Sequence, residues 1–316
     1  MRTRGDPLEL ILLVTYVKMV VVALILFAAA YSDIRSRKVP DRFWTLLVLS
    51  AAPLLVLEMI HRGALSRPST FLALCLPAGF MVFALYGYPE PKEVVKGKAV
   101  DITFTVIYLL LLAGAAVALF NGEPGMTSRI VFSFVFMMIY FILYSVPIGG
   151  TRIIHGGADA KCMVSLAAIF PWYGEILDIS FGPFYDLLAD QSSMEFFFPF
   201  HFSVMLNGAL ITVLFLVIFL PLVNISKKHY NPLRIFTSYH IKLDEIQGKF
   251  VWIYVKEDGK TTKKDPTPDL LKSLKEDGIE EVRVTPKIPF ILSLALGFVI
   301  QVVIGNLALI LVLSLM

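Results

Sequence analysis

Two aspartates, Asp33 and Asp159, stand at the ends of strongly apolar segments of the sequence. Asp159 follows Gly156 and Gly157 in the stretch RIIHGGADAK, directly before an apolar run. Two carboxyl groups held together at the edge of a membrane can activate water, because one accepts a proton from water while the other, protonated, donates to the substrate carbonyl. Two close carboxylates cannot both ionise cheaply, so they share a proton and titrate as a pair.

Each of these acids also has an ordinary local interpretation. Asp33 can pair with Arg35 or Arg37 in a polar loop. Asp159 can serve as a helix N-cap, a common role for aspartate. Lys161, two residues further on, either stabilises a carboxylate through its charge or extends its ammonium group to the membrane interface. If the two acids lie at one membrane depth, a functional role is favoured, because ionisable groups in spans are costly and often functional.

Other polar residues are weaker candidates for a site. His155 is interpreted as a loop residue, and Lys18 lies fifteen residues before Asp33, roughly 22 Å along a helix and therefore far from the acids. The two cysteines, Cys75 and Cys162, form no CxxC motif, which excludes a cysteine zinc site. No phosphate-binding loop, HExxH or GxSxG motif occurs, so we expect neither a metal nor a cofactor.

The elements that must position the acids are membrane helices. Hydrophobic residues make up 57% of the 316 residues and charged residues only 17%, well below the share of about 25% in a soluble protein. Several apolar runs approach or exceed the roughly 18 residues that span hydrocarbon. The sequence therefore predicts an all-α polytopic membrane protein with eight spans. The predicted spans are 8–31, 43–60, 69–88, 102–120, 130–148, 159–173, 202–224 and 288–315.

The distribution of lysine and arginine predicts the orientation of these spans. With the N-terminus outside, the inside segments carry 21 lysines and arginines and the outside segments carry 5. Loop 174–201 is then extracytoplasmic and segment 225–287 cytosolic. This orientation puts Asp33 and Asp159 at the same depth, on the cytosolic side.

Segment 225–287 is predicted to be a small α+β insert in the cytosol. Residues 249–255 alternate as in a strand and precede a turn at 258–259. Residues 267–278 form a predicted helix in which Thr267 caps the N-terminus, Pro268 occupies the first turn and Gly278 ends the helix. Residues 279–284 are a second predicted strand. The segment carries thirteen basic and ten acidic residues and is interpreted as a docking or spacer domain.

Three stretches resemble landmarks of the type IV prepilin peptidase family, and most closely its archaeal branch, the preflagellin peptidases. They are SDIRSRKVPDRFW at 32–44, GGADAK at 156–161 and VTPKIPFILSLALG at 284–297. The family's members are membrane aspartyl proteases of the GxGD type. The positions that match its pattern are Asp33, Val39, Pro40 and Asp41 in the first stretch, Gly156, Asp159 and Lys161 in the second, and Pro289, Phe290 and Gly297 in the third.

The resemblance implies that Asp33 and Asp159 are the catalytic pair. The residues expected to support them are Gly156, Gly157, Lys161, Pro40, Pro289 and Phe290. It also implies the partners: pilin-like or flagellin precursors with class III signal peptides, cut at the cytosolic face of the cell membrane after a basic leader and before an apolar helix. Membrane lipid is the other expected partner, and no nucleic acid is expected.

The chain departs from the family pattern in three ways. Ala158 replaces the second glycine of GxGD, a change that the archaeal branch tolerates. The cysteine tetrad and the methyltransferase half of many bacterial members are missing, so we expect no methylation. The family core has six spans with two between the aspartates, whereas four are counted here, which implies an inserted pair.

These observations predict a transmembrane peptidase core at 1–224, the cytosolic insert at 225–287 and a last transmembrane helix at 288–316 that completes the core. Two other functions stay open. A presenilin-like intramembrane protease shares the GxGD logic, although here Pro289 is followed by Phe290 and Ile291 and not by Ala-Leu. A transporter that uses both acids for proton or cation coupling is the non-enzymatic alternative, but no inverted repeat is visible.

Overall fold

A computed structural model describes residues 7–64, 67–82, 126–145, 154, 156–171, 199–226, 234–257 and 260–314, with isolated positions between 106 and 120. Most of the predicted span 102–120, His155, loop 174–198 and the predicted turn at 258–259 lie outside the described residues. The chain divides into two compact units. The first is Met1–Ala209 with Phe290–Met316, and the second is Leu210–Pro289. The three domains predicted from the sequence stay a prediction.

The first unit is built from helices. They are α1 (Pro7–Ser36), α2 (Arg42–His61), α3 (Pro68–Val82), α6 (Met126–Ser145), α7 (Gly157–Ile169), the start of α11 (Phe200–Ser226), α13 (Phe290–Val303) and α14 (Leu307–Ser314). Among the described residues, four helices are long and apolar enough to cross a membrane: Glu9–Ser36, Arg42–His61, Thr127–Tyr144 and Phe200–Ser226. The helices at Pro68–Met81 and Phe290–Val303 are apolar but shorter. The predicted total of eight spans is not established.

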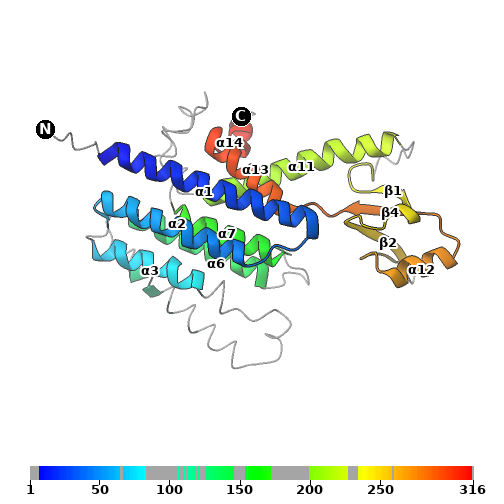
Figure 1. The fold of residues 1–316 in the computed structure, drawn as a ribbon, viewed down its shortest axis with the longest axis horizontal. Coiled ribbons are helices and arrows are strands. Elements are labelled where there is room, and N and C mark those ends of the chain that lie inside the picture. The colour runs from blue at the N-terminus through cyan, green and yellow to red at the C-terminus, as the bar shows by residue number, and fades with distance from the viewer. Residues whose placement is uncertain are drawn as a thin grey trace. The chain divides into compact units, whose positions relative to one another are not determined.

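Helix α7 lies at the centre of this unit. It contacts α2, α3, α6 and α13, while α1 packs on α2 and α13 (Figure 1). Most of its side chains from Ala160 to Ile169 are buried. A helix surrounded by protein on all sides needs small residues more than large apolar ones. This explains why α7, which carries Asp159, is the least obviously apolar of the predicted spans.

Helices α11 and α13 cross with their backbones in contact. A Cβ atom at Gly297 would lie 2.6 Å from the Gly208 nitrogen, and one at Gly208 would lie 2.9 Å from the Ser293 carbonyl oxygen. Only glycine allows such an approach. The glycine of the third landmark is therefore explained by the close packing of two apolar helices, in the manner of small-residue contacts in membranes.

The C-terminal apolar segment is not the single helix that the sequence predicted over 288–315. It breaks between α13 and α14 at Gly305, whose φ is 99°. The buried side chain of Asn207 satisfies the break, because its Nδ2 donates to the Gly305 carbonyl (2.9 Å) and its Oδ1 accepts from the Leu307 N–H (2.9 Å). Non-helical backbone at membrane depth is tolerated where protein groups satisfy it in this way.

The second unit contains the end of α11 and a four-stranded antiparallel sheet in the order β1-β4-β2-β3. Its elements are β1 (Tyr239–Lys242), the 3-10 helix η3 (Leu243–Glu245), β2 (Val251–Glu257), β3 (Lys260–Lys264), α12 (Pro268–Glu276) and β4 (Glu281–Pro286). One face of the sheet packs against α12 through Ile253, Val284 and Leu274.

The local predictions in this unit are largely confirmed. Thr267 caps α12 by accepting from the Leu270 N–H, Pro268 is its first residue, and Gly278 follows its end with a φ of 72°. Both predicted strands form, as β2 and β4. Strands β1 and β3 were not predicted. β1 is short and β3 has the sequence KTTKK, which lacks the apolar alternation that marks a strand.

Candidate active site

Asp33 lies in the last turn of α1, because the helix continues beyond the predicted span end to Ser36. Its half-buried carboxylate accepts a hydrogen bond from the backbone N–H of Ile291, in the first turn of α13. The first N–H groups of a helix have no partner within the helix and carry partial positive charge. The Pro289-Phe290-Ile291 landmark thus begins the helix whose free end binds Asp33.

The chain after α1 is folded back toward Asp33 by an unusual residue. Arg37 has a φ of 53°, a left-handed conformation that costs a non-glycine residue roughly 1–2 kcal/mol. The turn is held by the hydroxyls of Ser32 and Ser36, which donate to the Lys38 carbonyl at 2.9 and 3.1 Å. In this position the charge of Arg37 acts on Asp33. Partial burial lowers the pKa of the Arg37 guanidinium, an effect that the Asp33 carboxylate opposes.

Asp159 is the third residue of α7, and Gly156, with φ −95° and ψ 122°, is the N-cap. The aspartate is therefore not the cap that its local sequence allows. Its side chain folds back over Gly156, where an added Cβ would collide with the carboxylate and lie 2.9 Å from its carbon. A Cβ at Gly157 would lie 3.0 Å from the Tyr144 hydroxyl. Neither glycine has a positive φ. Glycine therefore suits these positions because a neighbouring side chain lies close to where a Cβ atom would be, and not because of the backbone conformation.

Asp33 and Asp159 come together in the folded chain. They belong to α1 and α7, and they lie close enough for the charge of Asp33 to act on the Asp159 carboxyl. Two interacting half-buried carboxyl groups are an arrangement that can hold one shared proton and activate a water molecule.

Lys161 connects the first two landmarks. Its ammonium group lies 2.7 Å from the carboxylate of Asp41, which precedes α2. Asp41 is free to form this pair because it makes no side-chain capping bond to α2. Pro40 is exposed, and its carbonyl accepts from the Phe43 N–H to start the helix. The charge of Lys161 therefore acts on a carboxylate, that of Asp41, and the contact fastens the start of α7 to the loop that follows Asp33.

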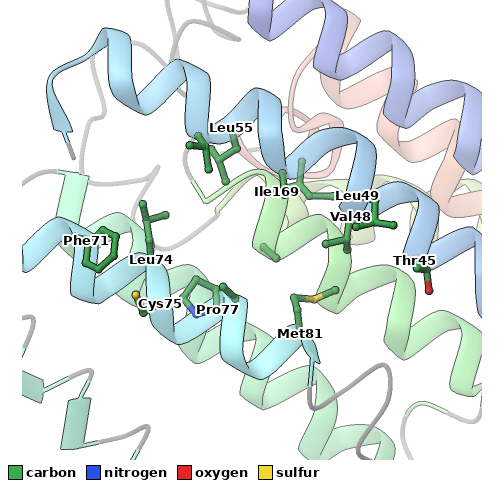
Figure 2. A pocket seen from close by; sticks show the side chains of 14 residues that line it. Thr45, Val48, Leu49, Leu55, Phe71, Leu74, Cys75, Pro77, Met81 and Ile169 are labelled. Atoms are coloured by element: carbon green, nitrogen blue, oxygen red, sulfur yellow. The ribbon is translucent and has the colours of Figure 1, made fainter.

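An apolar pocket of about 460 Å³ lies between α2, α3 and the end of α7 (Figure 2). Only Thr45, Cys75 and Met81 contribute side-chain oxygen or sulfur to its lining. Neither aspartate lines it, and Ile169 on its wall is ten residues beyond Asp159, about 15 Å along α7. The pocket therefore offers no acid or base for hydrolysis.

A second group of charges lies inside the helices, away from the acids. Lys18 of α1 and Glu58 of α2 form an ion pair of 2.7 Å, with side chains only 3% and 2% exposed. Arg62 lies 3.2 Å from the other oxygen of Glu58. Sequence reasoning placed Lys18 far from the acids but missed its partner. The sequence did contain a hint of this pair. A lysine inside a span requires an opposite charge nearby, and Glu58 stands at the outer end of the second predicted span.

These observations define a mostly helical protein with the character of a membrane protein, a small antiparallel sheet and two interacting acids. Residues 210–307 match the family model described as Archaeal Peptidase A24 C-terminus Type II. The match supports the archaeal prepilin and preflagellin peptidase family for this chain, and with it a protease. No curated protein and no solved structure matches the chain.

The matched residues contain the third landmark but neither aspartate. They run from α11 through the sheet to α13, whereas Asp33 and Asp159 belong to α1 and α7. The family match and the acid pair are therefore two separate lines of support, drawn from different parts of the sequence.

Proposed function

We propose that the chain is a membrane aspartyl endopeptidase that removes the basic leader from type IV pilin-like or archaeal flagellin precursors at the cytosolic membrane face. The observation that carries the proposal is the meeting of Asp33 and Asp159, which are 126 positions apart in the sequence. The family match at 210–307 supports a peptidase independently of that pair.

The contacts of the two acids support different roles in hydrolysis. Asp33 accepts the Ile291 N–H and lies near the charge of Arg37, and both favour its ionised form. We therefore assign Asp33 as the base that takes a proton from water. Asp159 carries the shared proton and donates it to the oxygen of the scissile carbonyl as water attacks the carbon. When the carbon–nitrogen bond breaks, the proton held by Asp33 passes to the leaving amine, and a hydroxyl of the tetrahedral intermediate returns a proton to Asp159 as the carboxylic acid forms.

The position of the acids supports a cut at the boundary between leader and apolar helix. Asp33 is in the last turn of α1 and Asp159 in the first turn of α7, so both lie at helix ends. A peptide within an apolar helix is internally hydrogen-bonded and shielded, whereas a junction becomes extended at lower cost. The apolar part of the precursor then stays in lipid and its basic leader reaches water.

The first test replaces each acid by its amide. Asp33→Asn and Asp159→Asn keep side-chain size but cannot exchange the proton, so each should lower precursor cleavage by at least roughly 10²-fold. Cleavage is followed by the mass of the precursor on co-expression with this chain. Asp269→Asn, an exposed acid on α12, is the matched control and should cleave normally. Retained cleavage in either acid variant removes that residue from the catalytic pair.

The second measurement maps the cut. The N-terminus of the product, read by mass spectrometry, should lie at the junction of the basic leader and the apolar segment. A cut several residues inside the apolar segment would reject this proposal in favour of a presenilin-like intramembrane protease.

A further inference from the structure

The second unit has a sheet face that its own core does not use. Side chains alternate along the strands, so that Val251, Ile253, Val282 and Val284 point toward α12 and are buried. The residues between them point the other way. We name this opposite side the basic aromatic face, and its residues are Trp252, Tyr254, Lys263, Arg283 and Lys287.

The cations on this face lie against aromatic rings. Arg283 is 3.9 Å from the centre of the Tyr254 ring, and Lys263 is 5.4 Å from it. Lys263 and Lys287 lie 5.7 and 5.2 Å from the centre of the Trp252 ring. Trp252 is nevertheless 38% exposed. The arrangement holds several positive charges in fixed positions beside an exposed indole.

Within the described part of the second unit, three of the cations on or beside this face have no acidic partner. Lys287 pairs with Asp265, but among the described residues no carboxylate lies at ion-pair distance from Lys263, Arg283 or the neighbouring Arg234. The Nε of Arg283 is buried and has no hydrogen-bond partner. Burial lowers the pKa of Arg283, the charge of Arg234 lowers it further, and Tyr254 opposes both effects. Like charges held close together favour the binding of an anion.

The unit's own contacts fix one corner of the sheet to the end of the apolar helix α11. Asn224, near the end of the apolar helix α11, donates to the Ser238 carbonyl at 2.9 Å, directly before β1. Thr285 of β4 donates to the Thr237 carbonyl at 2.8 Å, and Trp252 is the register partner of Thr285. Because neighbouring strands are about 4.8 Å apart, Trp252 is close to the corner of the sheet that is fixed to α11.

We propose that the basic aromatic face binds the anionic headgroups of the membrane leaflet at which α11 ends. Tryptophan and tyrosine are enriched at membrane–water interfaces, and lysine and arginine bind anionic lipid. The basic leader of a precursor is not the ligand, because its charge has the same sign. A nucleic acid would satisfy the charge, but the anchoring to an apolar helix favours lipid.

The test measures the distance of the face from lipid in the full chain. A fluorophore is attached to Thr261→Cys on β3, in a Cys75→Ala background where Cys162 is buried. The protein is reconstituted in nanodiscs that contain a lipid with a nitroxide headgroup, with phosphatidylcholine alone or with added phosphatidylglycerol. Quenching should be stronger with phosphatidylglycerol and should decrease at high salt. Each positive charge removed from the face should lower the ratio of membrane-bound to unbound protein faces roughly fivefold.

Two matched double variants decide the outcome. Lys263→Glu with Arg234→Glu should lose the phosphatidylglycerol-dependent quenching. Lys249→Glu with Lys272→Glu makes the same charge change on the α12 side and should keep it. Equal quenching in both lipid mixtures, or equal loss in both variants, overturns the proposal. The proposal is also overturned if Lys263 and Arg234 are needed for binding of a fluorescent oligonucleotide but not for the quenching by lipid. Precursor cleavage is not part of the readout, so the result is independent of the peptidase proposal.

Discussion

Helix α1 carries two ionised side chains whose surroundings differ completely. Near its end, Asp33 faces a second acid, Asp159, and both remain half-buried. Fifteen residues earlier, Lys18 is fully buried against the opposite charge of Glu58, 2.7 Å away. One helix therefore holds a like-charged pair at its end and an oppositely charged pair in its interior.

The difference shows that a charge inside a membrane helix does not by itself identify a functional site. Lys18 and Glu58 carry opposite charges in contact, and Arg62 lies on the same carboxylate, which is typical of a structural contact. Asp33 and Asp159 carry charge of the same sign and can share one proton, an arrangement that suits acid–base catalysis.

The largest effect on stability is expected at the buried ion pair. Glu58→Gln leaves the ammonium of Lys18 buried without an opposite charge, so the free energy of unfolding should fall by about 3–5 kcal/mol. Denaturant or thermal unfolding in detergent measures this loss. Replacing both residues, as Lys18→Met with Glu58→Met, should restore most of the stability, since buried pairs are often replaceable by apolar groups. A folded Glu58→Gln protein that no longer cleaves precursor would contradict the structural role.

A smaller effect, on activity alone, is expected at Gly156. In Gly156→Ala the new methyl group would lie 2.9 Å from the carboxyl carbon of Asp159, so the carboxyl must turn away. Cleavage should fall by up to roughly 10²-fold, the cost of about 1 Å of misplacement in a catalytic group. Gly79→Ala in α3 is the control, because nothing lies within 4 Å of the added Cβ. Full activity of Gly156→Ala would mean that the bent position of Asp159 is not used in catalysis.

The smallest effect is expected at the exposed end of the site. Lys161→Met removes the pair with Asp41, whose side chain is 60% exposed, and such pairs contribute about 0–1 kcal/mol. Cleavage should fall by less than roughly tenfold, and Asp41→Asn should add little to it in a double-mutant cycle. A loss as large as that of Asp159→Asn would instead show that Lys161 acts on the catalytic pair directly.

The sequence by itself was enough to predict what depends on local pattern. Long apolar runs predicted the helices of the first unit, and Thr267, Pro268 and Gly278 predicted the limits of α12. That Asp33 and Asp159 lie at one membrane depth stays a prediction from span order and loop charge. The match at 210–307 supports the family that three short motifs indicated. Each of these signals is contained in a short window of the chain or in a count of spans.

The tertiary structure alone decided which side chains are partners. Lys18 contacts a residue 40 positions away, Lys161 one 120 positions away, and Asp33 the first turn of the last long helix. Such contacts depend on how each helix is rotated and how deeply it packs. Hydrophobicity does not specify either in helices as uniformly apolar as these. Gly156 and Gly297 show the same limit, because the neighbour that requires a glycine becomes visible only when the backbones are packed together.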